Sequence, residues 1–310
     1  MNRAVLLALV LAASARGQTA QQPTPSADAD APQQDDSSRG WGVTLRQRDL
    51  AGNQSYWLTD TFLDAQLPHG LELNADFNAY RSNASTMTTP TTTFGGGWTY
   101  GDATLFASYA LTGRANDMAA NAADVGAAVH TADSAMRTTL SVDVSITHQL
   151  IYGLLPPSKK QILFDMTERT PTATLTQRFF DAVDAAVSLS ESKYNNLSAL
   201  EVLYNRPLTH AVIAQNSSVG GLVQGFPDWS ATYSLKYAPP QLPLTLKASY
   251  EAIQFVDTNF DGTHNSADVQ DYTAQYDFLP WLTLGVEYQH YRQTALASYD
   301  QYGGSAEVRF

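Results

Sequence analysis

From Trp41 to the last residue, apolar and polar side chains alternate with a period of two along much of the chain. The clearest stretches are LELNADFNA (71–79), LSVDVSITHQL (140–150), WSATYSLKY (229–237) and LTLGVEYQH (282–290). Successive side chains of a β-strand point to opposite faces, so one face of each stretch meets an apolar medium and the other meets water. The pattern predicts an all-β fold.

A β-sandwich gives the same local alternation and stays open as an alternative. Two features favour a membrane barrel. Many stretches reach nine or more residues, longer than usual globular strands and close to the length of a tilted membrane strand. Their polar faces carry Asp, Glu, Lys and Arg inside the strands, as a water-filled lumen permits. We predict a transmembrane antiparallel up-and-down β-barrel of about sixteen strands, or fourteen, because residues 153–171 can be read either way.

The links between the predicted strands alternate between short and long. The short links are AQLPHG (65–70), TYGDA (99–103), YNRPLT (204–209), YAPPQLP (237–243) and DFLPW (277–281). The long, polar links cover residues 81–93, about 113–136, 215–228 and 257–268. Short turns of membrane barrels face the periplasm and long loops face outward, so we expect both chain ends on the periplasmic side.

Aromatic residues gather near both kinds of link. Those near short links are Trp98, Tyr100, Tyr237, Phe278, Trp281 and Phe310; those near long links are Trp57, Tyr80, Trp229, Phe255 and Tyr291. Trp and Tyr favour the boundary between lipid and water. The positions predict two interfacial belts.

The first 39 residues lack the alternation. A positive start, an apolar run at residues 4–13 and a small-residue cleavage site predict a signal peptide over residues 1–17. Residues 18–39 are rich in Pro, Gln, Ser, Ala and Asp, which predicts a disordered periplasmic tether. The barrel then covers residues 40–310.

Composition excludes several classes of function. A net charge of -12 argues against a nucleic-acid partner, and the absence of cysteine excludes disulfides, Cys-ligated zinc, iron–sulfur clusters and covalently attached haem. The histidines lack metal-ligand spacing such as HExxH, and no GxSxG occurs. We therefore expect no enzymatic activity and no organic cofactor.

One motif suggests a metal. In DTNFDGTHNSAD, oxygen-bearing side chains occupy positions 1, 3, 5, 9 and 12 of an EF-hand-like calcium loop, with Gly262 at position 6. The predicted ligands are Asp257, Asn259, Asp261, Asn265 and Asp268. Asp replaces the usual Glu at position 12 and the flanks are strands, so a solvated loop without structural calcium is the alternative.

Strand parity also predicts which charged residues line the lumen. The predicted pore-lining residues are Glu72, Asp76, Asp143, Asp184, Lys236, Lys247, Glu251, Asp271 and Glu287. Carboxylates around a water-filled pore concentrate cations, so we expect mild cation selectivity, unless these charges merely pair with one another.

The terminal strand carries a resemblance to a known family. Tyr302, Gly304, Ala306, Val308 and Phe310 alternate with polar residues up to the last position. Together with the signal peptide and the strand–turn rhythm, this resembles Gram-negative outer-membrane β-barrel proteins of the porin-like superfamily.

The resemblance implies an outer-membrane location, contact with outer-membrane lipid, and recognition of Tyr302, Val308 and Phe310 by the barrel assembly machinery. The loop predicted at about 112–137 resembles the constriction loop of general porins, although their acidic PEFGG-type motif is absent. The predicted function is passive diffusion of small hydrophilic solutes. The alternatives are the conduit of an export or electron-transfer complex, such as a polysaccharide exporter, or a non-conducting surface-binding barrel.

Overall fold

The structure, a computed structural model, describes nine segments of the chain. They are residues 41–53, 57–82, 85–115, 118–131, 136–152, 162–195, 227–258, 264–294 and 298–310. The predicted signal peptide and tether lie outside the described residues, as do the link at 204–209 and most of the link at 215–228.

Almost every described residue belongs to a strand. The strands are β1 (Gly42–Gly52), β2 (Trp57–Leu67), β3 (Leu71–Ser82), β4 (Ser85–Tyr100), β5 (Ala103–Ala115), β6 (Met118–His130), β7 (Thr138–Tyr152), β8 (Ile162–Phe179), β9 (Val183–Glu191), β10 (Lys193–Tyr194), β11 (Pro227–Tyr237), β12 (Leu244–Thr258), β13 (His264–Leu279), β14 (Leu282–Gln293) and β15 (Tyr299–Arg309). One 3-10 turn, η3 (Pro68–Gly70), joins β2 to β3. No helix within the described residues is long and apolar enough to cross a bilayer.

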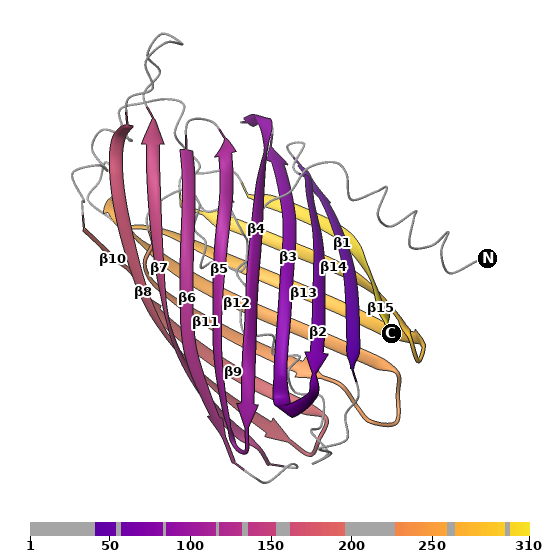
Figure 1. Cartoon of the computed structure of the whole chain (residues 1–310). Coiled ribbons are helices and arrows are strands. Elements are labelled where there is room, and N and C mark those ends of the chain that lie inside the picture. Colours follow the sequence, from indigo (N-terminus) through magenta and orange to yellow (C-terminus); the bar gives the residue numbers. More distant parts are fainter. Residues whose placement is uncertain are drawn as a thin grey trace.

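The strands form one closed antiparallel ring (Figure 1). Neighbours in sequence are neighbours in the sheet, β1 pairs with β15, and β8–β9 and β9–β11 pairings complete the circle. Short β10 continues β9 against β8. The predicted up-and-down barrel is confirmed, and the described ring holds fourteen strands plus β10, the smaller of the two expected counts.

The two ends of the barrel differ. Five tight connections, at 68–70, 101–102, 180–182, 238–243 and 280–281, lie at one end, which we call the turn end. The opposite end is the loop end. Because Thr44 pairs with Arg309, the start of β1 and the finish of β15 both lie at the turn end. Phe310 and Val43 then exchange two backbone hydrogen bonds, of 2.8 and 3.3 Å.

Two predicted long loops are wrong. Most of residues 81–93 belong to β3 and β4, and most of 112–137 belongs to β5 and β6, so the described residues after the fifth strand form β6 and not the predicted constriction loop. Runs of Thr in β4 and of Ala in β6 resemble a polar loop in composition. The β-branched Thr nevertheless suits a strand, and the small residues of β6 pair in register with β5 and β7 on both sides.

Apolar side chains form the outer surface of the ring. They include Leu73, Leu105, Val142, Leu189, Leu235 and Val286, all exposed. Exposed aromatics surround the turn end: Trp41, Trp98, Tyr100, Phe180, Tyr237, Phe278, Trp281 and Phe310. Exposed leucines and valines above an aromatic belt are the outer surface of a barrel that faces lipid, and the predicted belt at the short turns matches this surface.

The predicted belt near the loop end is wrong in part. Trp229 is exposed on the outer surface, but Phe255 and Tyr291 are fully buried and face the interior. The parity of each strand decides this: Phe255 continues the inward series Glu251 and Ile253, and Tyr291 pairs with inward-facing Val269. Ion pairs instead mark the outer surface near the loop end, including Arg292 with Asp268 at 2.9 Å and His148 with Asp165 at 2.6 Å.

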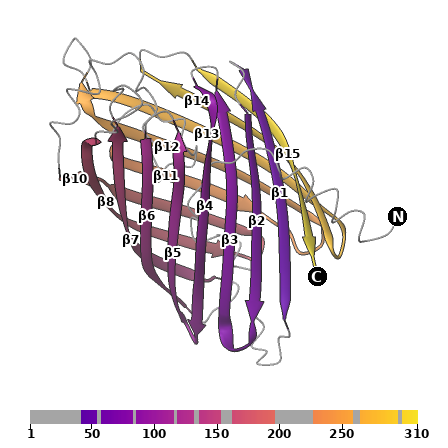
Figure 2. The same ribbon diagram turned by 45° about the horizontal axis from the view of Figure 1, so that its top comes forward.

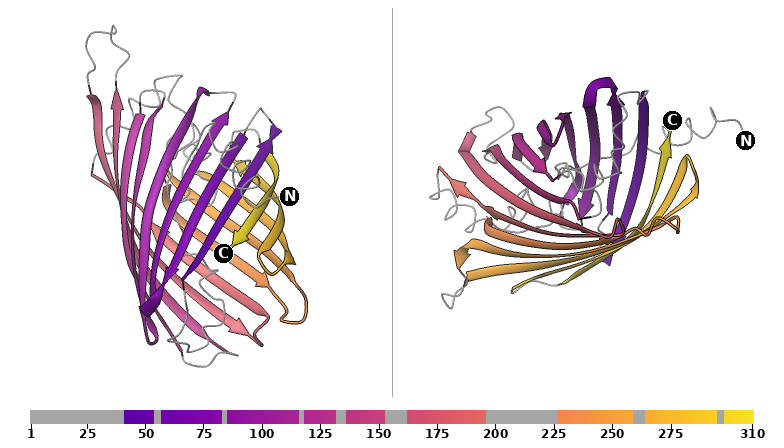
Figure 3. Two further views of the ribbon diagram at one scale, coloured as in Figure 1. Left: turned by 45° about the vertical axis from the view of Figure 1, so that its right-hand side comes forward. Right: turned by 90° about the horizontal axis from the view of Figure 1, so that it is seen from below.

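The ring has two facing walls. Figure 1 and Figure 2 show β1 to β8 in front, crossing the more inclined β11 to β14 behind. The view from below in Figure 3 shows the two walls approaching each other near β1 and β15. This arrangement brings the inner faces of β1 and β2 toward those of β12 to β14.

Candidate functional site: the barrel interior

Paired residues of an antiparallel sheet share a face, so the register identifies every inward side chain. Arg48 pairs with Asp60 on β2 and with Ser305 on β15, and Asp76 pairs with Thr93 on β4. Following such pairs around the ring gives an inner surface of charged, amide and hydroxyl side chains opposite the apolar outer surface.

The register places all nine predicted pore-lining residues on this inner face. Reasoning from the sequence missed four further inward carboxylates: Asp60, Asp64, Asp124 and Glu168. Asp60 and Asp64 alternate with apolar Leu58 and Phe62, which hides the polar face of β2. Asp124 lies in a stretch interpreted as a loop, and Glu168 lies in the ambiguous stretch 153–171.

At the turn-end mouth, charges of both signs pair. Arg178 donates from Nε and Nη2 to the two oxygens of Asp184, at 2.8 and 3.2 Å. Arg309 lies 2.8 Å from Glu307 and 3.7 Å from Asp277. Glu72 on β3 and Lys247 on β12 are further inward residues near this mouth.

Farther in, Arg48 links three strands. Its Nη1 lies 3.2 Å from Glu287 Oε1 on β14, and its Nε lies 3.5 Å from Asp60 Oδ2 on β2. Arg46 is the next inward residue of β1 toward the turn end. Its Cζ lies over the ring of Phe62, 4.9 Å from the ring centroid. The arginines of β1 thus place positive charge among inward carboxylates.

The wall from β4 to β11 has a different chemistry, because Ser and Thr dominate its inward positions. Their hydroxyls bond across neighbouring strands. The pairs are Thr91–Thr112 (2.9 Å), Thr99–Thr104 (3.0 Å), Thr170–Ser192 (2.9 Å), Thr174–Ser188 (2.9 Å) and Ser190–Ser230 (2.8 Å). Beside the charged residues of this wall, such as Asp143 and Asp184, these hydroxyls offer neutral donors and acceptors to polar solutes or water.

Toward the loop end the inward side chains are buried. Polar members include Asp60, Asn78, Thr147 and Gln149, and apolar members form one cluster of Leu50, Leu58, Ile253, Phe255, Ala267, Val269 and Tyr291. The interior therefore includes partly exposed side chains toward the turn end, among them Lys247 and Thr273, a region that we call the vestibule, and a packed region near the loop end.

The predicted calcium ligands lie in or beside β12 and β13. Asn259 and Asp261 lie outside the described residues. Asn265 is inward and buried, whereas Asp268 is on the outer face and accepts two hydrogen bonds from Arg292, at 2.9 and 3.0 Å. Within the described residues, no three His, Asp or Glu side chains gather where they could hold a metal ion. The calcium loop stays a prediction, for calcium titration followed by limited proteolysis to test.

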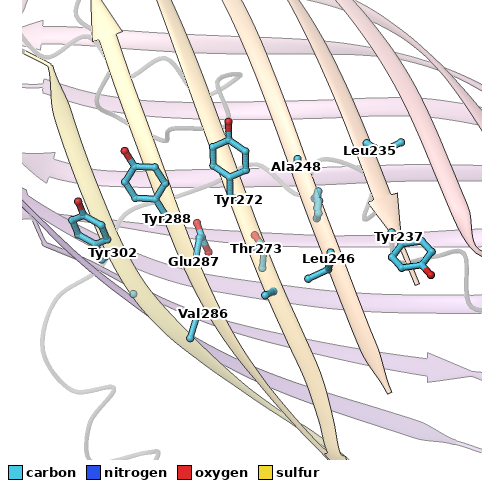
Figure 4. Close-up of a pocket in the computed structure, with 13 residues that line it drawn as sticks. Leu235, Tyr237, Leu246, Ala248, Tyr272, Thr273, Val286, Glu287, Tyr288 and Tyr302 are labelled. Carbon is cyan, nitrogen blue, oxygen red and sulfur yellow. The ribbon is translucent and has the colours of Figure 1, made fainter. Parts of the chain in front are cut away.

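A shallow apolar groove lies on the outer surface of β11 to β15 (Figure 4). A row of tyrosines, Tyr272, Tyr288 and Tyr302, forms one side, with ring centroids 6.1 and 5.1 Å apart. The small side chains Ala248 and Ala274 form part of its floor. Because the groove opens outward in the apolar surface, it faces lipid and not the lumen.

Comparison with known proteins identifies the fold. No protein-family model matches the chain, and no curated protein matches it. Among solved structures, CdiB from Acinetobacter baumannii has a TM-score of 0.51 at 6% identity, covering 88% of this chain and 60% of that one. OpdO from Pseudomonas aeruginosa has a TM-score of 0.46 at 11% identity, covering 87% and 96%.

A BenF-like porin from Pseudomonas fluorescens gives 0.45 at 11% identity, covering 87% and 98%. At such identities the likeness concerns the fold alone. The closed ring, the polar interior and the exposed apolar outer surface show that the chain folds as a closed antiparallel β-barrel of the kind that crosses a lipid bilayer.

Proposed function

We propose that this barrel is an outer-membrane channel through which small hydrophilic solutes diffuse passively. The observation that supports the proposal is the closed ring with a polar inner face and an apolar outer face. A ring without free edges satisfies the backbone within lipid, and hydroxyls and charges inside it favour water over hydrocarbon.

The proposal includes an orientation. The turn end, which carries the short connections and both ends of the barrel domain, would face the periplasm, and the loop end would face outward. Phe310 would then lie at the periplasmic interface. Accessibility of a C-terminal tag in intact and permeabilised cells tests this part: labelling in intact cells would contradict it.

The proposal also includes mild cation selectivity. Carboxylates outnumber basic groups on the inner face of the described strands, and the basic Arg48 and Arg178 already pair with acids. Inward carboxylates such as Glu72 and Asp143 would concentrate cations near the path.

Planar bilayers test both parts. We expect the purified full chain to give discrete conductance steps, with a reversal potential of cationic sign in a salt gradient. Glu72→Gln combined with Asp143→Asn should reduce that potential, whereas Asp268→Asn, on the outer surface, should leave it unchanged. Absence of steps from a folded barrel would refute the channel, and an anionic reversal potential would refute the selectivity alone.

One observation favours a non-conducting barrel as the second candidate. Inward side chains near the loop end, among them Asn78, Thr147 and Tyr291, are buried. A barrel filled there would present its loop end to ligands without passing solutes. The same bilayer recordings separate the two candidates, since only a channel gives steps.

A further inference from the structure

One cluster of buried apolar side chains faces inward near the loop end. Leu50 lies on β1, Leu58 on β2, Ile253 and Phe255 on β12, Ala267 and Val269 on β13, and Tyr291 on β14. Phe255 and Tyr291 are 0% exposed and Leu50 is 1% exposed. Exposing apolar groups of this size to a water-filled lumen is unfavourable, whereas packing them together lowers the free energy. Their burial in one cluster therefore indicates a dry contact.

The cluster joins strands far apart in the sequence. Leu50 and Leu58 are paired neighbours on β1 and β2, and Val269 and Tyr291 are paired neighbours on β13 and β14. Between these pairs lies β15, whose inward residue beside Leu50 is Gly303. A Cβ at Gly303 would collide with the Leu50 side chain and with the backbone oxygen of Asp49. The missing side chain lets Leu50 lie over β15 toward β14.

Along the strands that contribute to the cluster, the inward side chains change from charged or polar to apolar toward the loop end. On β1, Arg46 and Arg48 precede Leu50; on β12, Lys247 and Glu251 precede Ile253. On β13, inward Thr273 and Asp271 lie toward the turn end and Val269 toward the loop end. Apart from Glu251, which pairs with Val269, the charged residues named here lie on the turn-end side of the apolar cluster.

We propose that this cluster seals the interior between β1–β2 and β12–β14 near the loop end. Phe255 and Tyr291 then determine how wide the remaining path is. Figure 1 shows these two sets of strands as the front and rear walls of the barrel. The proposed seal rests only on the packing of the apolar cluster between the two walls. Its effect on conductance rests, in addition, on the proposed channel function.

The absence of cysteine permits a direct test of the seal, because a single introduced thiol is the only one in the chain. Val269→Cys places a thiol in the cluster, and Thr273→Cys places one on the same face of β13, about 13 Å nearer the turn end. The probe is a cationic methanethiosulfonate reagent, applied to the full chain in lipid vesicles.

We expect Thr273→Cys to react at least about tenfold faster than Val269→Cys, because water reaches only the former. Adding Phe255→Ala and Tyr291→Ala should raise the rate at Val269→Cys toward that at Thr273→Cys. Tyr272→Ala with Tyr288→Ala, which removes two outer tyrosines from β13 and β14, is the matched control and should leave the rate low. Heat-modifiable migration on gels verifies that each variant is folded.

Equal rates at the two thiols in the otherwise unchanged barrel would overturn the proposal. A rate at Val269→Cys that stays low in the Phe255→Ala, Tyr291→Ala background would also overturn it. Failure of the thiol at Thr273→Cys to react would do the same. Conductance is measured in parallel: the Phe255→Ala, Tyr291→Ala barrel should conduct more than the parent. If the thiol results hold and neither barrel conducts, the channel function fails while the seal stands.

Discussion

Arg48 forms two ion pairs in the middle of the interior. It joins Asp60 on the neighbouring β2 and Glu287 on β14, beyond β15, and its side chain is 15% exposed while those of Asp60 and Glu287 are 4% and 7% exposed. Removing one member of a buried ion pair costs more than the pair contributes, because the remaining charge loses its partner and stays desolvated.

Arg48→Ala should therefore lower the free energy of unfolding by about 2–3 kcal/mol. Urea titration in lipid vesicles, followed by tryptophan fluorescence, measures the change. Arg292→Ala is the control: its exposed pair with Asp268 lies on the outer surface and should change stability by less than about 1 kcal/mol. Equal effects of the two substitutions would show that Arg48 is merely solvated.

Glycine matters at residue scale where strands approach closely. Any side chain at Gly303 would meet the backbone of β1, whereas a Cβ at Gly97, also inward on its strand, would find its nearest neighbour at 3.4 Å. Gly303→Ala should cost about 1–3 kcal/mol through overpacking, and Gly97→Ala should cost much less. Urea midpoints of the two variants provide the comparison, and a Gly303→Ala barrel as stable as the parent would contradict the close contact.

Among the elements, β15 has two roles, since it closes the ring and ends the chain. It pairs with β14 along one edge and with β1 along the other, and its outward residues Tyr302 and Val308 lie on the apolar surface. The sequence predicted this strand correctly from its period-two pattern. Recognition of its last residue by the assembly machinery stays a prediction.

Phe310→Ala should lower the amount of folded barrel in the outer membrane several-fold, because the terminal aromatic is the expected assembly signal. Phe278→Ala is the matched control, because Phe278 belongs to the same exposed aromatic belt, 62% exposed against 63% for Phe310. Quantifying both variants in outer-membrane fractions tests the prediction. Equal losses would indicate that Phe310 acts only as an interfacial anchor.

β4 and β6 show why element boundaries were missed. Threonine and alanine carry little contrast in hydropathy, so period two is weak in STMTTPTTTF and in MAANAADVGAAVH. Register with their neighbours, and not local amphipathicity, makes these stretches strands. The hydropathy pattern of a single stretch does not reveal which neighbouring strand it pairs with.

At the scale of the whole molecule, ring closure is the defining feature, because it leaves no free edge for lipid or other chains. The unheated protein should therefore migrate differently from the boiled protein on gels containing dodecyl sulfate. Deleting residues 299–310 should abolish this shift, because β1 and β14 would both lose their partner. A shift that survives the deletion would contradict the ring.

Alternation along single strands was enough to determine the fold class, the apolar outer surface and the inward side of the predicted charges, since each depends on residues two positions apart. Tertiary structure alone decided which charges meet, how two walls pack near the loop end, and that Phe255 and Tyr291 turn inward. Those outcomes depend on register between strands and on the course of the ring, which bring together residues as distant as Leu50 and Tyr291.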